Sequence, residues 1–504
     1  MPFLGLADAS GIQRFLLHSP ELRKIAAASR QIENMCLPGG LYFNTPAECL
    51  VAAGGNAILR ADTRETLFFA FQQISRTLLE SGDDLQVVGC IEEYTDGKLP
   101  QAYRSALRRL DQRKLSQPRG TEFVFSGLTA PQHDTPFQQS DSPQRGLIRF
   151  NGKEYRQPQQ LEDMICLSAE AADLMAVVSV DGIGMGKKLN EWLAQWLAGC
   201  ETGQGDSSDH LDTKFIEEFR AWSGSLKERW RCAWEEAVST VMNAFTAEHS
   251  YTHPYFEGRR LELRRDPQST PFVPCRHVYQ GGDDLSFVCD ARLALSLTTR
   301  LMELLRDLPA EAGIPALFES IPTSAGVVFV DSHFPFSRAI SLSEQVRQAA
   351  KVKAQETDPE HPPCALNWWV NRSGATVYPK PLFEGATRKP YLLSGEDNQT
   401  GWHELDTQVL PGLWQTFGTA RNKLKDVLAA AEANDRGATV RRLLQQRPLR
   451  DTAGGIVSRP FPWERSEVSA QSGFNGSGQT MLLDTGELYD IYFPCISPAG
   501  SLST

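Results

Sequence analysis

The sequence lacks a long apolar run, any paired-cysteine spacing and an excess of positive charge. No segment reaches the roughly 18 consecutive apolar residues of a transmembrane helix, so we expect neither a membrane span nor secretion. The ten cysteines form no C-x-x-C pair and no zinc-finger spacing, which predicts reduced thiols in a cytoplasmic protein. The net charge of −11 argues against a protein that coats nucleic acid through many phosphate contacts.

What the sequence does contain is typical of a multidomain globular protein. At 504 residues, with 41% hydrophobic and 22% charged residues, it is expected to fold into two or three domains. A stretch from Leu128 to Arg145, rich in Pro, Gln, Ser and Asp, is typical of a linker. We therefore predict a first domain, an inter-domain region, a second domain and a partly helical C-terminal region, with bounds 1–125, 126–170, 171–358 and 359–504.

The second domain alternates strand and helix patterns. The apolar run LMAVVSVD ends in Asp181 and is typical of a strand buried on both faces. After a glycine-rich turn and two helical patterns, CRHVYQ and LSFVCD flank the turn GGDD and predict a β-hairpin. The complete order is strand, helix, helix, hairpin, helix, strand, helix. This order predicts an α+β fold with helices on one face of a mainly antiparallel sheet.

Three aspartates are predicted to meet at one edge of this sheet. Asp181 ends a strand, and Asp283 and Asp284 lie at the hairpin tip. Clustered carboxylates raise each other's pKa unless a cation neutralises them, and Mg²⁺ or Mn²⁺ prefers such ligands together with phosphate oxygens. The sequence therefore predicts a metal site that holds a nucleoside triphosphate. A hairpin turn whose Gly and Asp residues serve conformation alone is the alternative explanation.

The segment VDGIGMGKKLN, residues 180 to 190, invites comparison with a P-loop. A P-loop has four residues between its first glycine and its Gly-Lys pair, whereas three residues separate Gly182 from Gly186. Lys188 also stands where a metal-binding Ser or Thr belongs. We therefore interpret the segment as a strand end followed by a turn from which backbone amides and Lys187 approach a phosphate at a helix N-terminus.

Three segments carry a resemblance to a known family: Asp181 with GIGMG, then YQGGDDLSFV, then SAGVVFVDSHFPFSRAISLSEQVRQAAKVKA. Together they resemble the palm domain of the large polymerase/cyclase subunit of type III CRISPR effector complexes, whose wider relatives are the GGDEF-type cyclases. The resemblance implies a ferredoxin-like palm that uses two Mg²⁺ or Mn²⁺ ions to convert ATP into cyclic or linear oligonucleotide messengers in antiviral defence.

The resemblance also implies site residues. The metal-binding and catalytic carboxylates of the family match Asp181, Asp283 and Asp284, and its phosphate-approach glycines match Gly281 and Gly282. We add Gly182 to the metal ligands, and we add to the nucleotide-binding residues Gly182, Gly184, Gly186, Lys187 and Lys351.

The amino-terminal block is similar to the first palm of the same family. In VAAGGNAILRAD, which occupies the place of a second GGDD, Asn56 and Ala57 replace the two acids. The resemblance implies that this palm holds a second nucleotide and no metal, with Ser10, Gly54 and Gly55 as contacts, although a helix N-cap or turn explains Ser10 equally well. The expected fold class is α+β, with tandem ferredoxin-like (GGDEF-like) palm domains and a helical C-terminal region.

The chain also departs from the family pattern. We expect no HD nuclease domain and hence no DNA cleavage, and no cysteine zinc module, while Ile183 stands where the family commonly has a second Asp. The expected partners are ATP or other nucleoside triphosphates, a guide RNA or CRISPR effector subunits, and further copies of the chain. Two alternatives are a non-catalytic scaffold subunit, against which the intact acids argue, and a template-directed polymerase, against which the acidic charge argues.

Overall fold

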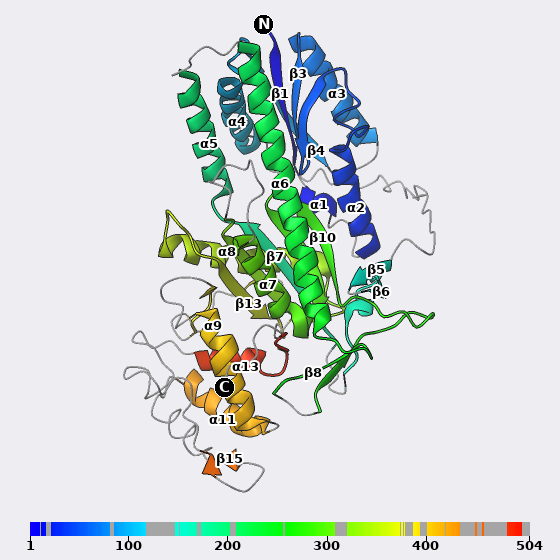
Figure 1. Ribbon diagram of the computed structural model, residues 1–504, viewed down its shortest axis with the longest axis vertical. Coiled ribbons are helices and arrows are strands. Elements are labelled where there is room, and N and C mark those ends of the chain that lie inside the picture. Colours follow the sequence, from blue (N-terminus) through cyan, green and yellow to red (C-terminus); the bar gives the residue numbers. More distant parts are fainter. Residues whose placement is uncertain are drawn as a thin grey trace, which may run out of the picture. The chain divides into compact units, whose positions relative to one another are not determined.

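The chain divides into two compact units, which the computed structural model describes for most of their residues (Figure 1). Unit 1 comprises Met1–His18, Lys24–Gln157 and Lys187–Gly224, and unit 2 comprises Ser19–Arg23, Pro158–Gly186 and Ser225–Thr504. The described residues are 1–10, 12–16, 22–80, 85–116, 147–150, 152–168, 173–201, 208–255, 258–307, 320–372, 374–375, 377–378, 387–393, 401–418, 420–433, 449–450, 456–457 and 481–495. The predicted domain boundaries stay predictions, and the proposed linker lies outside the described residues.

Unit 1 contains a four-stranded antiparallel sheet. Its strand order is β2-β3-β1-β4, the order of a ferredoxin-like fold. Helix α3 packs on this sheet through Leu67, Ala70, Ile74 and Leu78, whose spacing places them on one helical face. The elements are β1 (Phe3–Ser10), α1 (Ile12–Leu16), α2 (Leu22–Met35), β2 (Glu48–Ala53), β3 (Asn56–Ala61), α3 (Arg64–Glu80), β4 (Gln86–Glu93), α4 (Leu99–Ser116), β5 (Leu147–Phe150) and β6 (Lys153–Arg156).

Unit 2 contains a six-stranded sheet that repeats this order and extends it, β10-β11-β7-β12-β13-β14. The predicted succession of strand, helix, helix, hairpin, helix, strand and helix is confirmed. The elements between residues 158 and 392 are η1 (Glu162–Met164), β7 (Leu174–Gly182), α5 (Met185–Glu201), α6 (Ser208–Asn243), β8 (Ser250–Thr252), β9 (Arg260–Glu262), β10 (Cys275–Gly281), β11 (Asp284–Asp290), η2 (Ala291–Leu293), α7 (Ala294–Asp307), β12 (Thr323–Asp331), α8 (Phe336–Thr357), β13 (Ala365–Val370) and β14 (Tyr391–Leu392). Of these, α5 from Lys187 onward and α6 up to Gly224 belong to unit 1.

Helices cover both faces of the unit 2 sheet, so the expectation of helices on one face is wrong. On one face, the rings of Trp234 in α6 and Phe287 in β11 lie 5.0 Å apart. On the other face, Ser343 of α8 and Ser179 of β7 share a hydrogen bond of 2.6 Å, and Ser179 pairs with Ser286, the neighbour of Phe287. The reason is that β12 and β13 are parallel, which requires a crossover connection, and α8 is that crossover.

Helix α8 lies close against β12 at Gly326. A Cβ atom at this position would lie 2.2 Å from the carbonyl oxygen of Ser343 and 2.3 Å from the backbone nitrogen of Arg347. Because both atoms belong to the backbone of α8, no side chain at position 326 fits without moving the helix. This glycine therefore sets the distance between α8 and the strand that it covers.

We expect Gly326→Ala to lower the free energy of unfolding by about 1–3 kcal/mol, the usual cost of overpacking. Gly224→Ala in α6 is the control, because no heavy atom lies within 4 Å of its added Cβ. Alanine has the higher helix propensity, so the control is expected to gain up to about 1 kcal/mol. Urea denaturation of the three proteins measures both effects. Equal stability of the wild type and Gly326→Ala would contradict the close packing.

The C-terminal region is partly helical, as predicted, and it packs on the edge of the unit 2 sheet. Trp368 of β13 is fully buried, stacks on Tyr391 with centroids 5.3 Å apart, and donates its indole N–H to Glu487 at 2.9 Å. No described helix is long and apolar enough to cross a bilayer. The elements are α9 (Trp402–Glu404), η4 (Leu405–Val409), α10 (Leu410–Phe417), α11 (Arg421–Glu432), β15 (Leu449–Arg450), β16 (Ile456–Val457) and α13 (Met481–Leu488).

Candidate active site

The GGDD segment forms the tip of the β10–β11 hairpin. Gly281 pairs with Asp284, so Gly282 and Asp283 are the two turn residues. Gly282 has a φ of +61°, a backbone conformation that glycine adopts without strain. A Cβ atom at Gly281 would lie 1.7 Å from the hydroxyl of Tyr279. The turn thus requires glycine at position 282, whereas a side chain at position 281 would require Tyr279 to move. The predicted contact of both glycines with phosphate stays a prediction.

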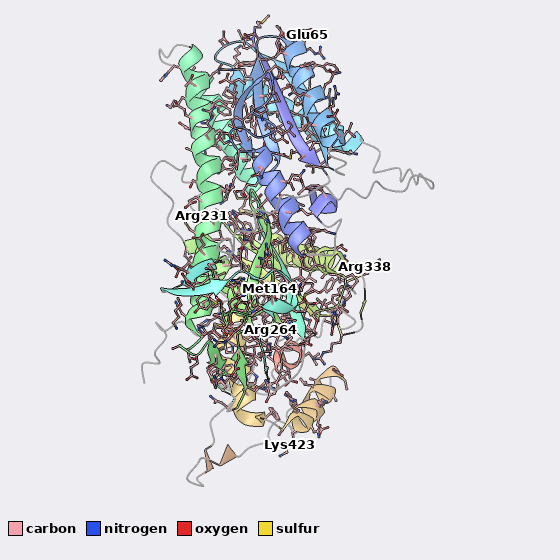
Figure 2. The ribbon with its side chains drawn as sticks, turned by 90° about the vertical axis from the view of Figure 1, so that its right-hand side faces the viewer. Glu65, Met164, Arg231, Arg264, Arg338 and Lys423 are labelled. Atoms are coloured by element: carbon pink, nitrogen blue, oxygen red, sulfur yellow. The ribbon has the colours of Figure 1, made fainter. Side chains whose placement is uncertain are left out.

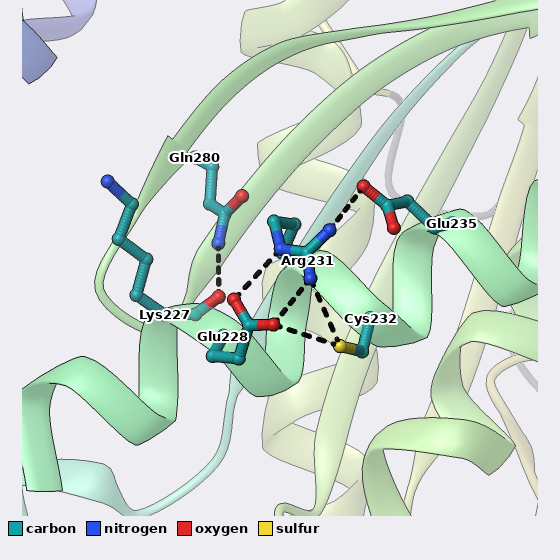
Figure 3. Close-up of polar contacts among 6 residues, drawn as sticks. All are labelled: Lys227, Glu228, Arg231, Cys232, Glu235 and Gln280. Atoms are coloured by element: carbon teal, nitrogen blue, oxygen red, sulfur yellow. Dashed lines mark hydrogen bonds and ion pairs between the residues drawn. The ribbon is translucent and has the colours of Figure 1, made fainter. Parts of the chain in front are cut away.

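The hairpin is attached to α6 just before its tip. Gln280 donates its side-chain amide to the carbonyl oxygen of Lys227 at 3.2 Å (Figure 3). On the same stretch of α6, Arg231 forms ion pairs with Glu228 and Glu235. The hydrogen bond from Gln280 connects the hairpin to a helix through a backbone acceptor and so limits how far the tip can move.

Asp181, Asp283 and Asp284 come from two adjacent strand ends, as the sequence predicted. Asp284 of β11 lies directly opposite Asp181 of β7 in the antiparallel register. Gly182 donates its backbone N–H to the carbonyl oxygen of Asp283 at 2.9 Å. A Cβ atom at Gly182 would lie 3.1 Å from the Asp283 carboxylate and 2.8 Å from Met185. The absence of a side chain at Gly182 therefore allows the hairpin tip to approach β7 this closely.

Two cations of α8 bind the Asp181 carboxylate. The guanidinium of Arg347 lies 2.5 Å and the ammonium of Lys351 lies 2.7 Å from the same oxygen, Oδ2. Lys351 was predicted to bind a nucleotide, whereas Arg347 was missed. Its sequence signal was the spacing of four residues from Lys351, which places both side chains on one face of the helix. The structure thus adds Arg347 to the site and places Lys351 in it.

Burial and mutual repulsion raise the pKa values of the hairpin carboxylates. The pKa of Asp283 is raised to about 6 and that of Asp284 to about 7, in both cases first by burial and then by the charge of Asp181. Glu344 of α8 raises the pKa of Asp284 further, and burial raises the pKa of Glu344 itself. The site therefore holds more negative charge than its cations neutralise, so it favours an additional cation.

The donor set suits a hard divalent ion, although it is not assembled around one. Among the described residues, no group of three or more His, Cys, Asp or Glu side chains lies close enough together to hold a metal ion. The carboxylate oxygens of Asp283 and Asp284 are the ligand type that Mg²⁺ and Mn²⁺ prefer, and their raised pKa values are what a bound cation would reverse. Asp181 could bind the same metal ion if its carboxylate left Arg347 and Lys351, or if it contacted the metal and these two cations together.

Ile183 follows Asp181 by two residues and is buried in the core of unit 2. Its side chain is 1% exposed and packs with Ala350, Ala354 and Ala365. Its backbone N–H donates to Pro322 at 2.7 Å. The side chain at this position belongs to the hydrophobic core and supplies no ligand to a metal.

The remaining predicted residues of this segment lie around the start of α5. Gly184 has a φ of +77°, and Gly186 is exposed in the first turn of α5, with no atom within 4 Å of an added Cβ. Lys187 belongs to unit 1, where its ammonium lies 4.0 Å from Glu191. The structure thus gives Gly184 a conformational role, and the nucleotide contacts of Gly184, Gly186 and Lys187 stay predictions.

The sheet of unit 1 has an edge equivalent to the one that carries GGDD in unit 2. The residues of unit 1 that match GGDD are shifted by one position from those that the sequence predicted. Asn56 lies opposite Asp8 in the register, as Asp284 lies opposite Asp181. Gly54 and Gly55 are the two turn residues, with φ values of +59° and +85°. Gly55 and Asn56 therefore stand in place of Asp283 and Asp284, whereas the sequence comparison had assigned Asn56 and Ala57.

This first edge retains one acid. Asp8, which the sequence analysis missed, binds the ammonium of Lys114 on α4 at 2.5 Å. Ser10 is the last residue of β1 and donates its hydroxyl to Gln86 at 3.4 Å, so it is a strand residue and not a helix N-cap. The carbonyl oxygen of Gly55 accepts hydrogen bonds from Tyr42 and Ala9. The edge of the unit 1 sheet thus has an acid–lysine pair, Asp8 with Lys114, but no counterparts of Asp283 and Asp284.

Comparison with known proteins places this site in a recognised domain. Residues 174–358 match the sequence model described as Cas10/Cmr2, second palm domain. Solved structures similar to the chain include the apo Csm1-Csm4 cassette (TM-score 0.51), the cassette in complex with AMPPNP (0.52) and the cassette in complex with one ATP (0.51). Each is 15% identical and covers 97% of this chain and 70% of the other. At this identity they show the fold alone, and no curated protein matches.

Proposed function

We propose that the chain is a metal-dependent nucleotidyltransferase that converts ATP into cyclic or linear oligonucleotides, because residues 174–358 match the second palm domain of Cas10/Cmr2. The observation that carries this proposal is the pairing of Asp181 with Asp284 on adjacent strands, together with the contacts of two cations of α8 with Asp181. Carboxylates that can bind Mg²⁺, next to basic side chains that can bind phosphate, suit a nucleoside triphosphate that carries Mg²⁺. The solved cassettes in complex with AMPPNP and ATP support the same class of ligand.

In this proposal the acidic residues bind the metal ions and the basic residues bind the triphosphate. Asp181, Asp283 and Asp284 hold Mg²⁺ or Mn²⁺, with the backbone of Gly182 beside them. When bound, the metal ions would activate the attacking hydroxyl and neutralise the departing pyrophosphate. Lys351 and Arg347 bind the triphosphate and orient it. The partial burial that raises the pKa values of Asp283 and Asp284 also reduces their contact with water, which strengthens these electrostatic interactions.

We propose that the first palm holds a second nucleotide without a metal. It has glycine and asparagine where the second palm has Asp283 and Asp284, so it lacks their ligands, while Lys114 supplies a positive charge. Ser10, Gly54 and Gly55 are its proposed contacts. We also propose that the protein is cytoplasmic and that its partners are a guide RNA, further copies of the chain and an effector subunit. The similar solved structures, which are Csm1-Csm4 cassettes, support the effector subunit.

One observation favours the alternative of a non-catalytic scaffold subunit. Asp181 is occupied by Arg347 and Lys351, and the three acids are not gathered at metal-binding spacing. To separate the two functions, the full chain would be incubated with each labelled nucleoside triphosphate and Mg²⁺ or Mn²⁺, with and without cell RNA and candidate partners. Products that form with release of pyrophosphate, resolved by chromatography and mass, are expected. No product under any condition would favour the scaffold.

We expect Lys351→Met to raise the KM for the nucleotide about 10- to 100-fold, the effect of losing a charge-assisted contact of roughly 1.5–3 kcal/mol. The reason is that Lys351 lies beside Asp181 and supplies one of the two positive charges proposed to bind the triphosphate. Steady-state kinetics of pyrophosphate release measures the change. Lys353→Met is the matched control, because Lys353 is an exposed residue of the same helix. Equal KM values in the two variants would remove Lys351 from the proposed binding site.

A further inference from the structure

The two cations on Asp181 occupy the oxygen that a metal ion would need. Arg347 and Lys351, here called the cation pair, both lie within 2.7 Å of Oδ2. A divalent ion bound to that oxygen would lie close to two like charges in a half-buried setting, where repulsion is weakly screened. In the nucleotide-free protein, the cation pair and a metal ion therefore compete for Asp181.

Arg347 is held in this position by the packing of its helix. Its backbone nitrogen lies against Gly326, and the hydrogen bond between Ser179 and Ser343 fixes α8 on β7 one turn earlier. The Arg347 side chain is 15% exposed, so its guanidinium lies against Asp181 largely shielded from solvent. The contact is thus part of the folded core and not a loose surface ion pair.

Arg347 also has an unused donor. Its Nε atom is buried and has no hydrogen-bond partner. A buried donor without a partner costs free energy that an incoming acceptor recovers. Phosphate oxygens are the acceptors that a guanidinium binds best, through two parallel N–H donors. The side chain is therefore incompletely satisfied by Asp181 and can gain a bond from a triphosphate.

The first palm provides an internal comparison. Lys114 is the sixteenth residue of α4 and Lys351 is the sixteenth of α8, and each binds an acid in the last three residues of the first strand of its sheet. The twelfth residue is the buried Leu110 in α4 and Arg347 in α8. The lysine is thus common to both palms, whereas the arginine is present only in the palm that has the additional acids.

We infer that Arg347 is a positioning residue that keeps metal off Asp181 until a triphosphate takes over its guanidinium, an inference that rests on the proposed function. In the nucleotide-free protein, Arg347 neutralises Asp181 and weakens metal binding. A triphosphate competes for the cation pair, Asp181 is released from both Arg347 and Lys351, and the metal carried by the nucleotide gains a third carboxylate. Metal and nucleotide then bind cooperatively, and the metal alone binds weakly.

The test measures binding, not turnover. Mn²⁺ alone is titrated into the nucleotide-free full chain by electron paramagnetic resonance, for the wild type, Arg347→Gln and Arg338→Gln. Arg338, labelled in Figure 2, is an exposed residue of the same helix and the matched control. We expect Arg347→Gln to bind Mn²⁺ about tenfold tighter, since one repelling charge is lost, and the control to match the wild type. In Asp181→Asn/Arg347→Gln the gain should disappear.

A second titration uses AMPPNP in excess EDTA, so that no metal takes part. Here Arg347→Gln should bind about tenfold more weakly than the wild type, because a charge-assisted contact with phosphate is lost. Partial unfolding would weaken the binding of both Mn²⁺ and AMPPNP, so it cannot produce tighter Mn²⁺ binding together with weaker AMPPNP binding. Unchanged or weaker Mn²⁺ binding in Arg347→Gln, or equal changes in Arg338→Gln, would overturn the inference. An inactive wild type with tighter Mn²⁺ binding in Arg347→Gln would instead refute only the proposed function.

Discussion

The Asp283→Asn/Asp284→Asn protein is expected to release pyrophosphate from ATP at no more than about one thousandth of the wild-type rate. Asparagine retains the size of aspartate and the hairpin, but it removes both negative charges that would hold the metal ions. Because Gly281 still pairs with residue 284, the sheet edge should keep its shape. The measurement is the rate of pyrophosphate release with Mg²⁺ and with Mn²⁺, together with the mass of the products.

The control for this variant is Glu356→Gln, which makes the same exchange of acid for amide at an exposed position of α8. It should retain the wild-type rate. Thermal unfolding of all three proteins checks that the loss of activity does not come from a loss of structure. Equal activity of the double variant and the wild type would show that the GGDD acids serve only the turn, and the nucleotidyltransferase proposal would fail.

The Asp284→Asn protein is expected to be more stable than the wild type by roughly 2–4 kcal/mol at pH 8 in the absence of metal. The folded-state pKa of Asp284 is raised from 3.8 to about 7, chiefly by burial, so the folded state holds this proton more tightly than the unfolded chain. The contribution to stability is fully present below pH 4 and is lost as the pH rises through 7. Asparagine has no carboxyl group to ionise, so the variant does not lose stability as the pH rises through 7.

Urea denaturation from pH 4 to pH 8 in EDTA tests this expectation. The stability difference between Asp284→Asn and the wild type should be small at pH 4 and grow through the interval up to pH 7. Glu356→Gln should show no such growth, because its carboxylate is exposed. Adding Mg²⁺ at pH 8 should stabilise the wild type more than the variant, since the ion binds the charged carboxylate. A difference that does not change with pH would instead indicate altered packing.

The sequence determined the elements of the second palm because they depend on local patterns. The continuous apolar run of β7 predicted a strand buried on both faces, and residues 175–178 are fully buried. The glycines of GGDD predicted a tight hairpin, and the φ of +61° at Gly282 shows why glycine is needed there. Since Asp181 and Asp284 end and begin neighbouring strands, sequence order also predicted that the acids would lie at one edge.

Other features were decided by packing between segments that are distant in the sequence. Arg347 binds Asp181 across 166 residues, and no local pattern shows where the face of α8 will point. The contact requires the bare Cα of Gly326 under the helix, which only the assembled sheet reveals. The alignment of the first palm differed by one residue because a hairpin register is set by strand pairing and not by the number of glycines. Sequence thus specified the acidic edge, and tertiary packing supplied the two cations that neutralise it in part.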